Sequence, residues 1–168
     1  MIRETTTATT RDTSSRPALG RKAPAVISML LALALLAPSA SQASNKTLKA
    51  AVGKWSHTIA LDARGISLSA SLRHPRRMML RARRFHADSL RARRAIAAQR
   101  PTTARGRRAK RAALGAFGNY AVVGTEWARS GQARLRGHKA VALRHATIAQ
   151  KYARRGNTLL RTAGRLLR

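Results

Sequence analysis

The side chains that could perform acid–base chemistry are few in this chain and lie far apart in the sequence. After residue 43 the carboxylates are Asp62, Asp88 and Glu126. General acid–base catalysis needs two carboxylates, or a carboxylate and a histidine, held at a fixed geometry. Asp88 lies four residues after Arg84 and three before Arg91, which is the spacing of a surface ion pair on a helix. We therefore expect no catalytic residues and no enzymatic activity.

Metal ligands are equally scarce. His138, His145 and Tyr152 recur at intervals of seven residues. Two histidines with this spacing on a helix are separated by about 10 Å along its axis, too far to bind one metal ion without help from other helices. Positions at the boundary of an apolar helix face are the better interpretation. The chain has no cysteine, which excludes disulfides and thiolate metal sites. We expect neither a metal ion nor a cofactor.

Positive charge is the dominant chemical feature. The 168 residues include 35 Lys and Arg against 5 Asp and Glu, a formal net charge of +30. Such an excess repels itself in a compact chain, and its usual explanation is an anionic partner such as nucleic acid, an anionic envelope polymer or an anionic membrane surface. The alternative is the Arg- and Ala-rich composition that a GC-rich genome tends to encode, although this explains the scarcity of acids poorly.

The charge is densest in one segment that contains no acidic residue. Its nine basic residues are Arg91, Arg93, Arg94, Arg100, Arg105, Arg107, Arg108, Lys110 and Arg111. Guanidinium groups beside the backbone N–H groups of a helix start suit phosphate or carboxylate oxygens. We predict that these nine residues bind a polyanion. The alternative is a solvated or disordered basic stretch.

Four amphipathic segments must position these residues, and no strand-like alternation is present. We predict helices from Ser44 or Asn45 to His74, from Arg76 to Gln99, from the Thr102-Thr103 pair to Ser130-Gly131, and from Gln132 to Leu167. In the third helix Gly115, Gly118 and Gly124 indicate close contact with a neighbour, and in the fourth Gly156 is a point where the helix could be interrupted. The short connections favour an all-α fold, an antiparallel up-down-up-down four-helix bundle with an Ala-rich core.

This topology places further charge beside the basic segment. Lys46 and Lys49 at the start of the first helix, and Arg161, Arg165 and Arg168 at the end of the last, would lie at the same end of the bundle. A separate expectation concerns Asp62 and Arg93, which fall on the apolar faces of the first and second helices. Their placement permits a buried ion pair that fixes the register of the two helices.

The aromatic residues favour some polyanions over others. Trp55, Phe85, Tyr120, Trp127 and Tyr152 fall on apolar arcs, and Phe117 falls at the edge of one. Proteins that bind single strands expose aromatic rings as stacking platforms, whereas these rings are expected to pack in the core. Duplex DNA, anionic wall polymers, polyphosphate and anionic lipid headgroups therefore fit better than sequence-specific RNA.

The N-terminal 43 residues resemble a secretory signal peptide in their organisation. Arg21 and Lys22 precede the segment 25–37, which is apolar except for Ser28, and small residues occupy positions 41 and 43. This apolar run of 13 residues is shorter than the roughly 20 that span a bilayer. We expect cleavage after Ala43 on the general secretory route, leaving residues 44–168 as one helical, strongly basic domain that is secreted or retained in the cell envelope.

The function these features favour is a cationic binding protein that holds polyanions, namely DNA, an anionic wall polymer or polyphosphate, by charge. One alternative is a membrane-active protein that uses its C-terminal helix, whose basic arc includes Arg136, Arg144 and Arg154, on anionic membranes. Another alternative is a structural or interaction module.

Overall fold

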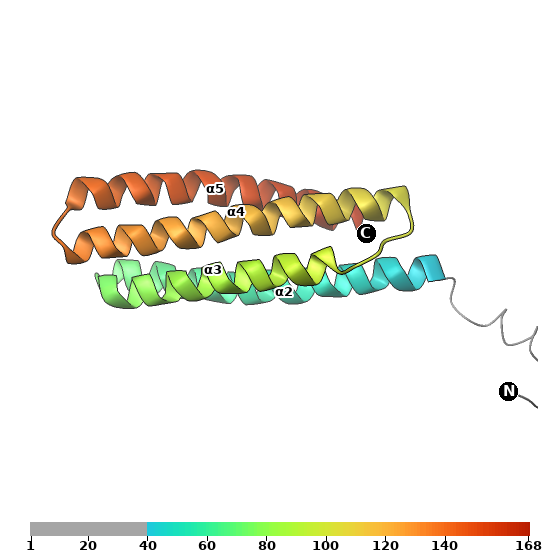
Figure 1. Cartoon of the computed structure of the whole chain (residues 1–168), viewed down its shortest axis with the longest axis horizontal. Helices are drawn as coiled ribbons and strands as arrows, with labels where there is room; N and C mark the ends of the chain where they lie inside the picture. The colour runs from blue at the N-terminus through green and yellow to red at the C-terminus, as the bar shows by residue number, and fades with distance from the viewer. Residues whose placement is uncertain (1–39) are drawn as a thin grey trace, which may run out of the picture. The chain divides into compact units, whose positions relative to one another are not determined.

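The computed structural model describes residues 40–168, with side chains from residue 44 onward, and forms four α-helices (Figure 1). They are α2 (Ala40–Ser71), α3 (Pro75–Ala97), α4 (Ala104–Leu135) and α5 (Lys139–Leu166). No strand occurs between residues 40 and 168, and the helices pack into a bundle, so the predicted all-helical fold class is confirmed. The predicted signal peptide lies largely outside the described residues.

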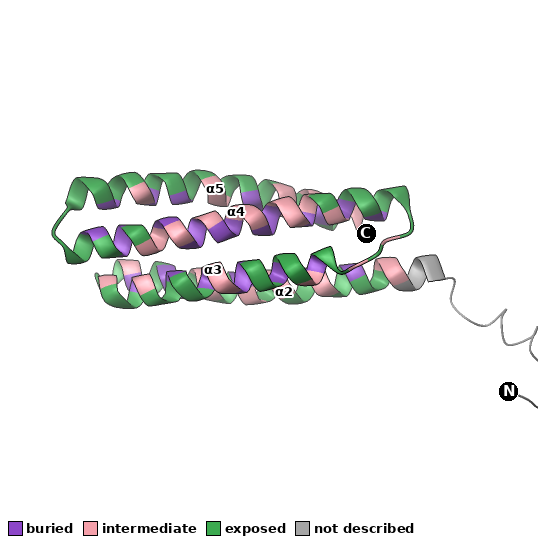
Figure 2. Ribbon diagram, in the orientation of Figure 1, coloured by how far each residue is buried: buried purple, intermediate pink, exposed green. Residues whose placement is uncertain are grey.

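The helix α4 lies at the centre of the packing. It contacts both α3 and α5 extensively, whereas α2 packs mainly on α3. Thirteen residues of α4 are buried, against seven in α3 and five in α5, because α4 is covered on two sides (Figure 2). The helix α4 therefore contributes the most buried residues to the bundle.

The core combines aliphatic residues with many alanines. The apolar face predicted for the first helix supplies Leu48, Val52, Ile59 and Ile66, all buried. Seven of the seventeen residues of the core cluster are alanine, as expected, so the helices can approach closely. Tyr120 contacts the rings of Phe85 and Phe117 edge-on, each at a centroid distance of 6.1 Å. Phe117 is fully buried, so its predicted place at the edge of an apolar arc is wrong.

The predicted end of the third helix is also wrong. The helix α4 continues through Ser130 and Gly131 to Leu135, and the left-handed residue of the turn is Gly137, with φ 77°. Gly131 serves close packing instead, since a Cβ atom there would lie 2.9 Å from the backbone oxygen of Pro75. Ser130 donates a hydrogen bond of 2.9 Å to the Ala142 carbonyl and so joins α4 to α5.

Three other boundary predictions need correction. The last helix begins at Lys139 rather than at Gln132, which lies inside α4. Ser44 and Asn45 lie inside α2, which begins at Ala40, rather than capping it. The helix α5 has 28 residues and is continuous through Gly156, where a Cβ would lie 2.7 Å from the Tyr120 ring. Close contact is confirmed for Gly124, where a Cβ would meet the His86 backbone nitrogen at 2.7 Å, but Gly118 has nothing within 4 Å.

Candidate polyanion-binding surface

All three carboxylate side chains of residues 44–168 are withdrawn from the surface. The exposed fraction of the side chain is 13% for Asp62 and 8% for Asp88 and for Glu126. Each carboxylate has a cationic partner within 4 Å. The three carboxylates therefore neutralise only the arginines in contact with them, and the outer surface of this part of the chain exposes little carboxylate.

Asp62 and Asp88 share one guanidinium group. Arg84 Nε lies 3.6 Å from an oxygen of each carboxylate, and Arg91 donates a further hydrogen bond of 2.8 Å to Asp88. Burial raises the pKa of Asp62 above its ordinary value. Hydrogen bonding to Asp88 and the negative charge of Asp88 raise this pKa further, whereas Arg84 and then Arg81 lower it.

The predictions for these two carboxylates were right in part. Asp88 pairs with Arg84 and Arg91, as its spacing indicated, but it is buried rather than on the surface. The predicted ion pair between Asp62 and Arg93 is wrong, because Arg93 is exposed and Asp62 pairs with Arg84. Arg93 lies beside α4 instead, where it borders Leu114 and Gly115.

Glu126 has a polar environment that the sequence analysis missed. Its carboxylate accepts a hydrogen bond of 2.7 Å from Arg129 and lies 2.6 Å from His145 Nδ1. The Arg129 contact follows from the three-residue spacing on α4. The His145 contact joins α4 to α5 and could not be read from spacing, although the predicted boundary position of His145 agrees with its half-buried side chain. These partners hold Glu126 as a structural charge.

The basic residues, in contrast, lie on the surface. Residues 44–168 contain thirty Lys and Arg residues, and twenty-nine of them are exposed, the exception being Lys110. Within this range only Arg84, Arg91 and Arg129 form an ion pair with a carboxylate side chain. Most of the cationic surface is therefore electrostatically uncompensated.

The structure places the nine predicted site residues along the last turns of α3, the α3–α4 connection and the first turns of α4. Four of the nine already have partners. Arg91 pairs with Asp88, and Lys110 Nζ lies 2.6 Å from the carbonyl oxygens of both Ala97 and Gln99, where a cation is favoured at the end of α3. Arg105 donates to the Arg165 carbonyl at 3.0 Å, and Arg107 donates to the Thr102 carbonyl at 2.6 Å. The five that remain exposed without such partners are Arg93, Arg94, Arg100, Arg108 and Arg111.

The start of α4 meets the start of α2 and the end of α5, as the sequence predicted. Lys46, Lys49, Arg105 and Arg168 line one cleft of about 390 Å³. Asn45 donates a hydrogen bond of 3.1 Å to Thr103 Oγ1, which ties the start of α2 to the start of α4. We call this end of the bundle the basic pole. It comprises the nine residues from Arg91 to Arg111 together with Lys46, Lys49, Arg161, Arg165 and Arg168.

The first turn of α4 increases the positive potential of the basic pole. Thr103 caps this helix, and its hydroxyl accepts the Gly106 N–H at 2.9 Å. No acidic residue follows in the first turn, where Arg105 and Arg107 instead face the positive end of the helix dipole. A bound anion would relieve this unfavourable arrangement of charge.

The aromatic residues do not form a stacking surface in the described part of the chain. Phe85, Phe117 and Tyr120 are buried, while Trp55, Trp127 and Tyr152 are half-buried against the core. The Tyr120 hydroxyl donates to Asn157 at 2.6 Å, and burial raises the pKa of Tyr120 to about 12. Core packing was predicted for these rings, and the structure agrees.

Comparisons of this chain with protein-family models, with curated proteins and with solved structures gave no match. Among the described residues, no helix is both long and apolar enough to cross a membrane. The same part of the chain holds no cluster of three or more His, Asp or Glu side chains suited to a metal ion. Fold and site together define a helical bundle with a strongly cationic surface.

Proposed function

We propose that this protein binds polyanions by charge, with the basic pole as the principal contact surface. The observation that carries the proposal is the separation of charges. In residues 44–168 no carboxylate side chain is more than 13% exposed, whereas twenty-nine of thirty Lys and Arg side chains are exposed. A surface of this kind gains free energy when it replaces the counterions of a phosphate or carboxylate polymer.

The finer features of the proposal rest on the sequence pattern. The short connections favour an antiparallel up-down-up-down order of the helices, and the N-terminal segment favours export on the general secretory route. Duplex DNA, polyphosphate and anionic wall polymers are the partner classes that suit a surface without exposed aromatic rings. A protein that binds single strands is disfavoured, because no aromatic platform accompanies the cations of residues 44–168.

The membrane-active alternative receives less support. The helix α5 directs Ala142, Ala146, Ala149 and Ala163 into the bundle, where they are buried against neighbouring helices. A surface-seeking helix uses such an arc to enter the lipid headgroup region. The alanine part of the apolar arc of α5 is occupied in the folded protein, so insertion of that part into a membrane would require α5 to leave the bundle, although Val141, Leu143 and Ile148 of this helix are exposed.

Two triple variants distinguish binding at the basic pole from binding that depends only on total charge. The first replaces Arg100, Arg108 and Arg111 with Gln, and the control replaces Lys54, Arg64 and Arg144, which are exposed away from the pole. Both remove three charges. Binding of the full chain to a labelled duplex would be followed by fluorescence anisotropy, and circular dichroism would verify helix content.

The pole variant should bind roughly 500-fold more weakly near 0.1 M salt, because each phosphate that is no longer neutralised reduces the affinity by about 0.9 of a power of ten at that concentration. The control should bind less than about tenfold more weakly, since its residues lie outside the contact surface. Equal reductions in both variants would contradict a defined pole, and binding unchanged in both would contradict binding by charge.

A further inference from the structure

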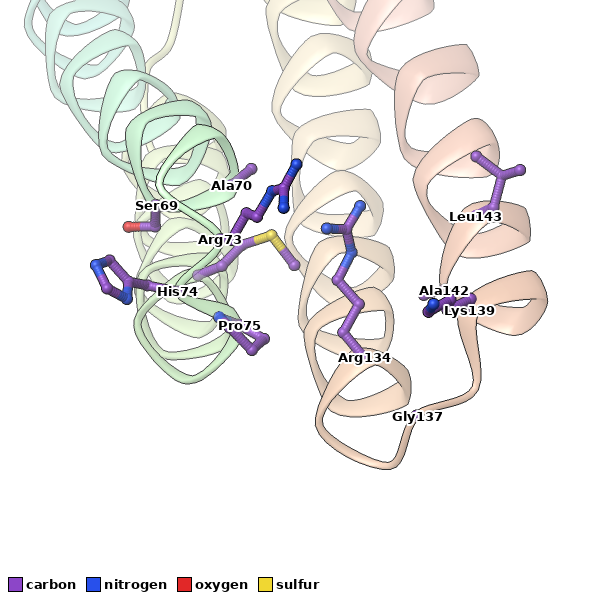
Figure 3. Close-up of a pocket in the computed structure, with 11 residues that line it drawn as sticks. Ser69, Ala70, Arg73, His74, Pro75, Arg134, Gly137, Lys139, Ala142 and Leu143 are labelled. Atoms are coloured by element: carbon purple, nitrogen blue, oxygen red, sulfur yellow. The ribbon is translucent and has the colours of Figure 1, made fainter.

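The end of the bundle opposite the basic pole contains a cleft of different character. It lies where the α2–α3 turn meets the α4–α5 turn, and its volume is about 420 Å³. Figure 3 shows residues from all four helices converging there. None of the basic-pole residues lines it. Pockets of this size bind small molecules.

The two turns that form this end share one backbone geometry. In each, the second residue after the helix end donates to the carbonyl three residues earlier, and the next residue donates to the carbonyl five residues earlier. These paired bonds define the Schellman motif, in which the first of the two residues adopts a left-handed conformation. That residue is Gly137 after α4, with φ 77°, and Arg73 after α2, with φ 53°.

Arg73 is therefore found where glycine is favoured. Glycine adopts the left-handed conformation at little cost, whereas a residue with a Cβ atom is strained there. Arg73 is the one residue other than glycine in residues 40–168 with positive φ. The equivalent turn at Gly137 avoids this strain, so the strain at Arg73 points to a role for its side chain.

The Arg73 side chain joins a second cation in the cleft. Figure 3 shows the Arg73 guanidinium group in the gap between the α2–α3 pair and α4 and the Arg134 side chain extended along α4, while the His74 ring points the other way; both arginines line the cleft. Lys139 adds a third cation from α5, and no carboxylate lines the cleft. Within residues 44–168 none of these three side chains forms an ion pair or a hydrogen bond.

The remaining lining of the cleft is largely apolar. Met78 and Ala142, each 1% exposed, form part of its wall, and Ala70 and Pro75 border it. Leu143 lies at its edge with 66% of its surface exposed. An apolar wall next to three cations matches a molecule with one anionic end and one hydrocarbon end.

We propose that this cleft binds a small amphipathic anion, with Arg73 and Arg134 holding its carboxylate or phosphate group and Met78 and Leu143 contacting its hydrocarbon chain. The site goes beyond the proposed polyanion binding and uses different residues. Loss of one activity therefore need not accompany loss of the other.

Decanoate is a suitable probe, and its binding to the full chain can be measured by isothermal titration calorimetry. Wild-type protein should bind one decanoate saturably. Arg73→Gly and Arg134→Gln should each weaken this binding by about tenfold or more, since each removes a charge-assisted hydrogen bond. Arg76→Gln, an equal loss of charge just outside the cleft, should retain wild-type affinity. Decanol and inorganic phosphate should each bind at least about tenfold more weakly than decanoate, because decanol lacks the anionic group and phosphate lacks the hydrocarbon chain.

Arg73→Gly also controls for folding, because glycine suits the left-handed position and the thermal midpoint of this variant should not fall. Its affinity for duplex DNA should stay close to that of the wild type. The proposal is overturned if Arg73→Gly binds decanoate as tightly as wild type, or if decanol binds equally well. Binding to anionic phosphatidylglycerol vesicles without binding of free decanoate would assign the cleft to a membrane surface and overturn it as well.

Discussion

Asp62 and Asp88 illustrate how a chain with few acids uses them. Both carboxylates are largely buried and both contact Arg84, so two negative charges share one guanidinium group. One oxygen of Asp62, Oδ2, is buried without a hydrogen-bond partner. Burial and the nearby Asp88 raise the pKa of Asp62, which means that the folded protein favours a proton on this carboxyl group.

A consequence for stability follows from the direction of this shift. The pKa of Asp62 is higher in the folded protein than its unfolded value of 3.8. Asp62 therefore makes its full contribution to stability below pH 3.8, and this contribution is lost as the pH rises through the folded-state pKa. The charged form of Asp62 therefore opposes folding at neutral pH. Asp62→Asn should raise the thermal midpoint near about pH 7, and the difference from wild type should shrink as pH falls toward about 4.

Glu126→Gln provides the matched comparison, since it makes the same chemical change at a carboxylate with two short hydrogen bonds. It should lower the free energy of unfolding by about 1–3 kcal/mol at neutral pH, because it removes the charge that Arg129 and His145 contact. Thermal unfolding followed by circular dichroism measures both variants. A midpoint for Asp62→Asn below that of wild type at neutral pH would show that the Arg84 contact outweighs burial.

Sequence spacing identified some of these residue contacts and not others. Pairs within one helix, such as Asp88 with Arg84 and Arg91, follow from helical spacing of three and four residues. Contacts between helices depend on register and rotation, which spacing does not determine. For that reason the partner of Asp62 was predicted wrongly, and the contact between Glu126 and His145 was not predicted at all.

The distance between α4 and its neighbours varies along the helix, and the surroundings of its glycines show this variation. At Gly124 a Cβ would lie 2.7 Å from the His86 backbone nitrogen and 2.8 Å from the Ala82 carbonyl oxygen. Those atoms belong to the backbone of α3 and cannot rotate away. At Gly118, on the same helix, a Cβ would meet nothing within 4 Å.

Substitution by alanine should therefore have opposite effects at these two positions. Gly124→Ala forces α3 and α4 apart and should destabilise the protein by about 1–3 kcal/mol. Gly118→Ala gains helix propensity without a clash and should stabilise it by up to about 1 kcal/mol. Urea unfolding of both variants measures the two effects. Stabilisation by Gly124→Ala would contradict the close packing of α3 on α4.

The two roles of glycine, contact residue and helix cap, explain the boundary that the sequence pattern placed wrongly. Gly131 and Gly137 both follow a helical segment, and either could end it by adopting a left-handed conformation. Only the packing of Gly131 against the Pro75 carbonyl shows that the first is a contact residue and the second is the cap. Apolar periodicity, in contrast, correctly placed the core face of α2. Pro101 and the Thr102-Thr103 pair indicated the connection between the second and third helices, which begins two residues earlier than predicted because α3 ends at Ala97 rather than at Gln99.

At the scale of the whole molecule, the described residues oppose thirty cations with three carboxylate side chains. Repulsion among exposed cations works against compaction. Burial of an Ala-rich core and the ties between helices at Ser130, Tyr120 and Glu126 work in favour of it. A bound polyanion would reduce the repulsion and stabilise the fold at the same time.

The central claim is that uncompensated surface cations hold a polyanion, and the salt dependence of duplex binding tests it most directly. Five arginines between Arg91 and Arg111 are exposed and have no partner within residues 44–168, namely Arg93, Arg94, Arg100, Arg108 and Arg111. If each neutralises one phosphate, the logarithm of the association constant should fall against the logarithm of salt concentration with a slope of about −4 to −5. Such a slope, with helix content unchanged across the series, is the expected result. A slope near zero, or affinity for anionic liposomes that survives high salt while duplex binding is absent, would contradict the claim.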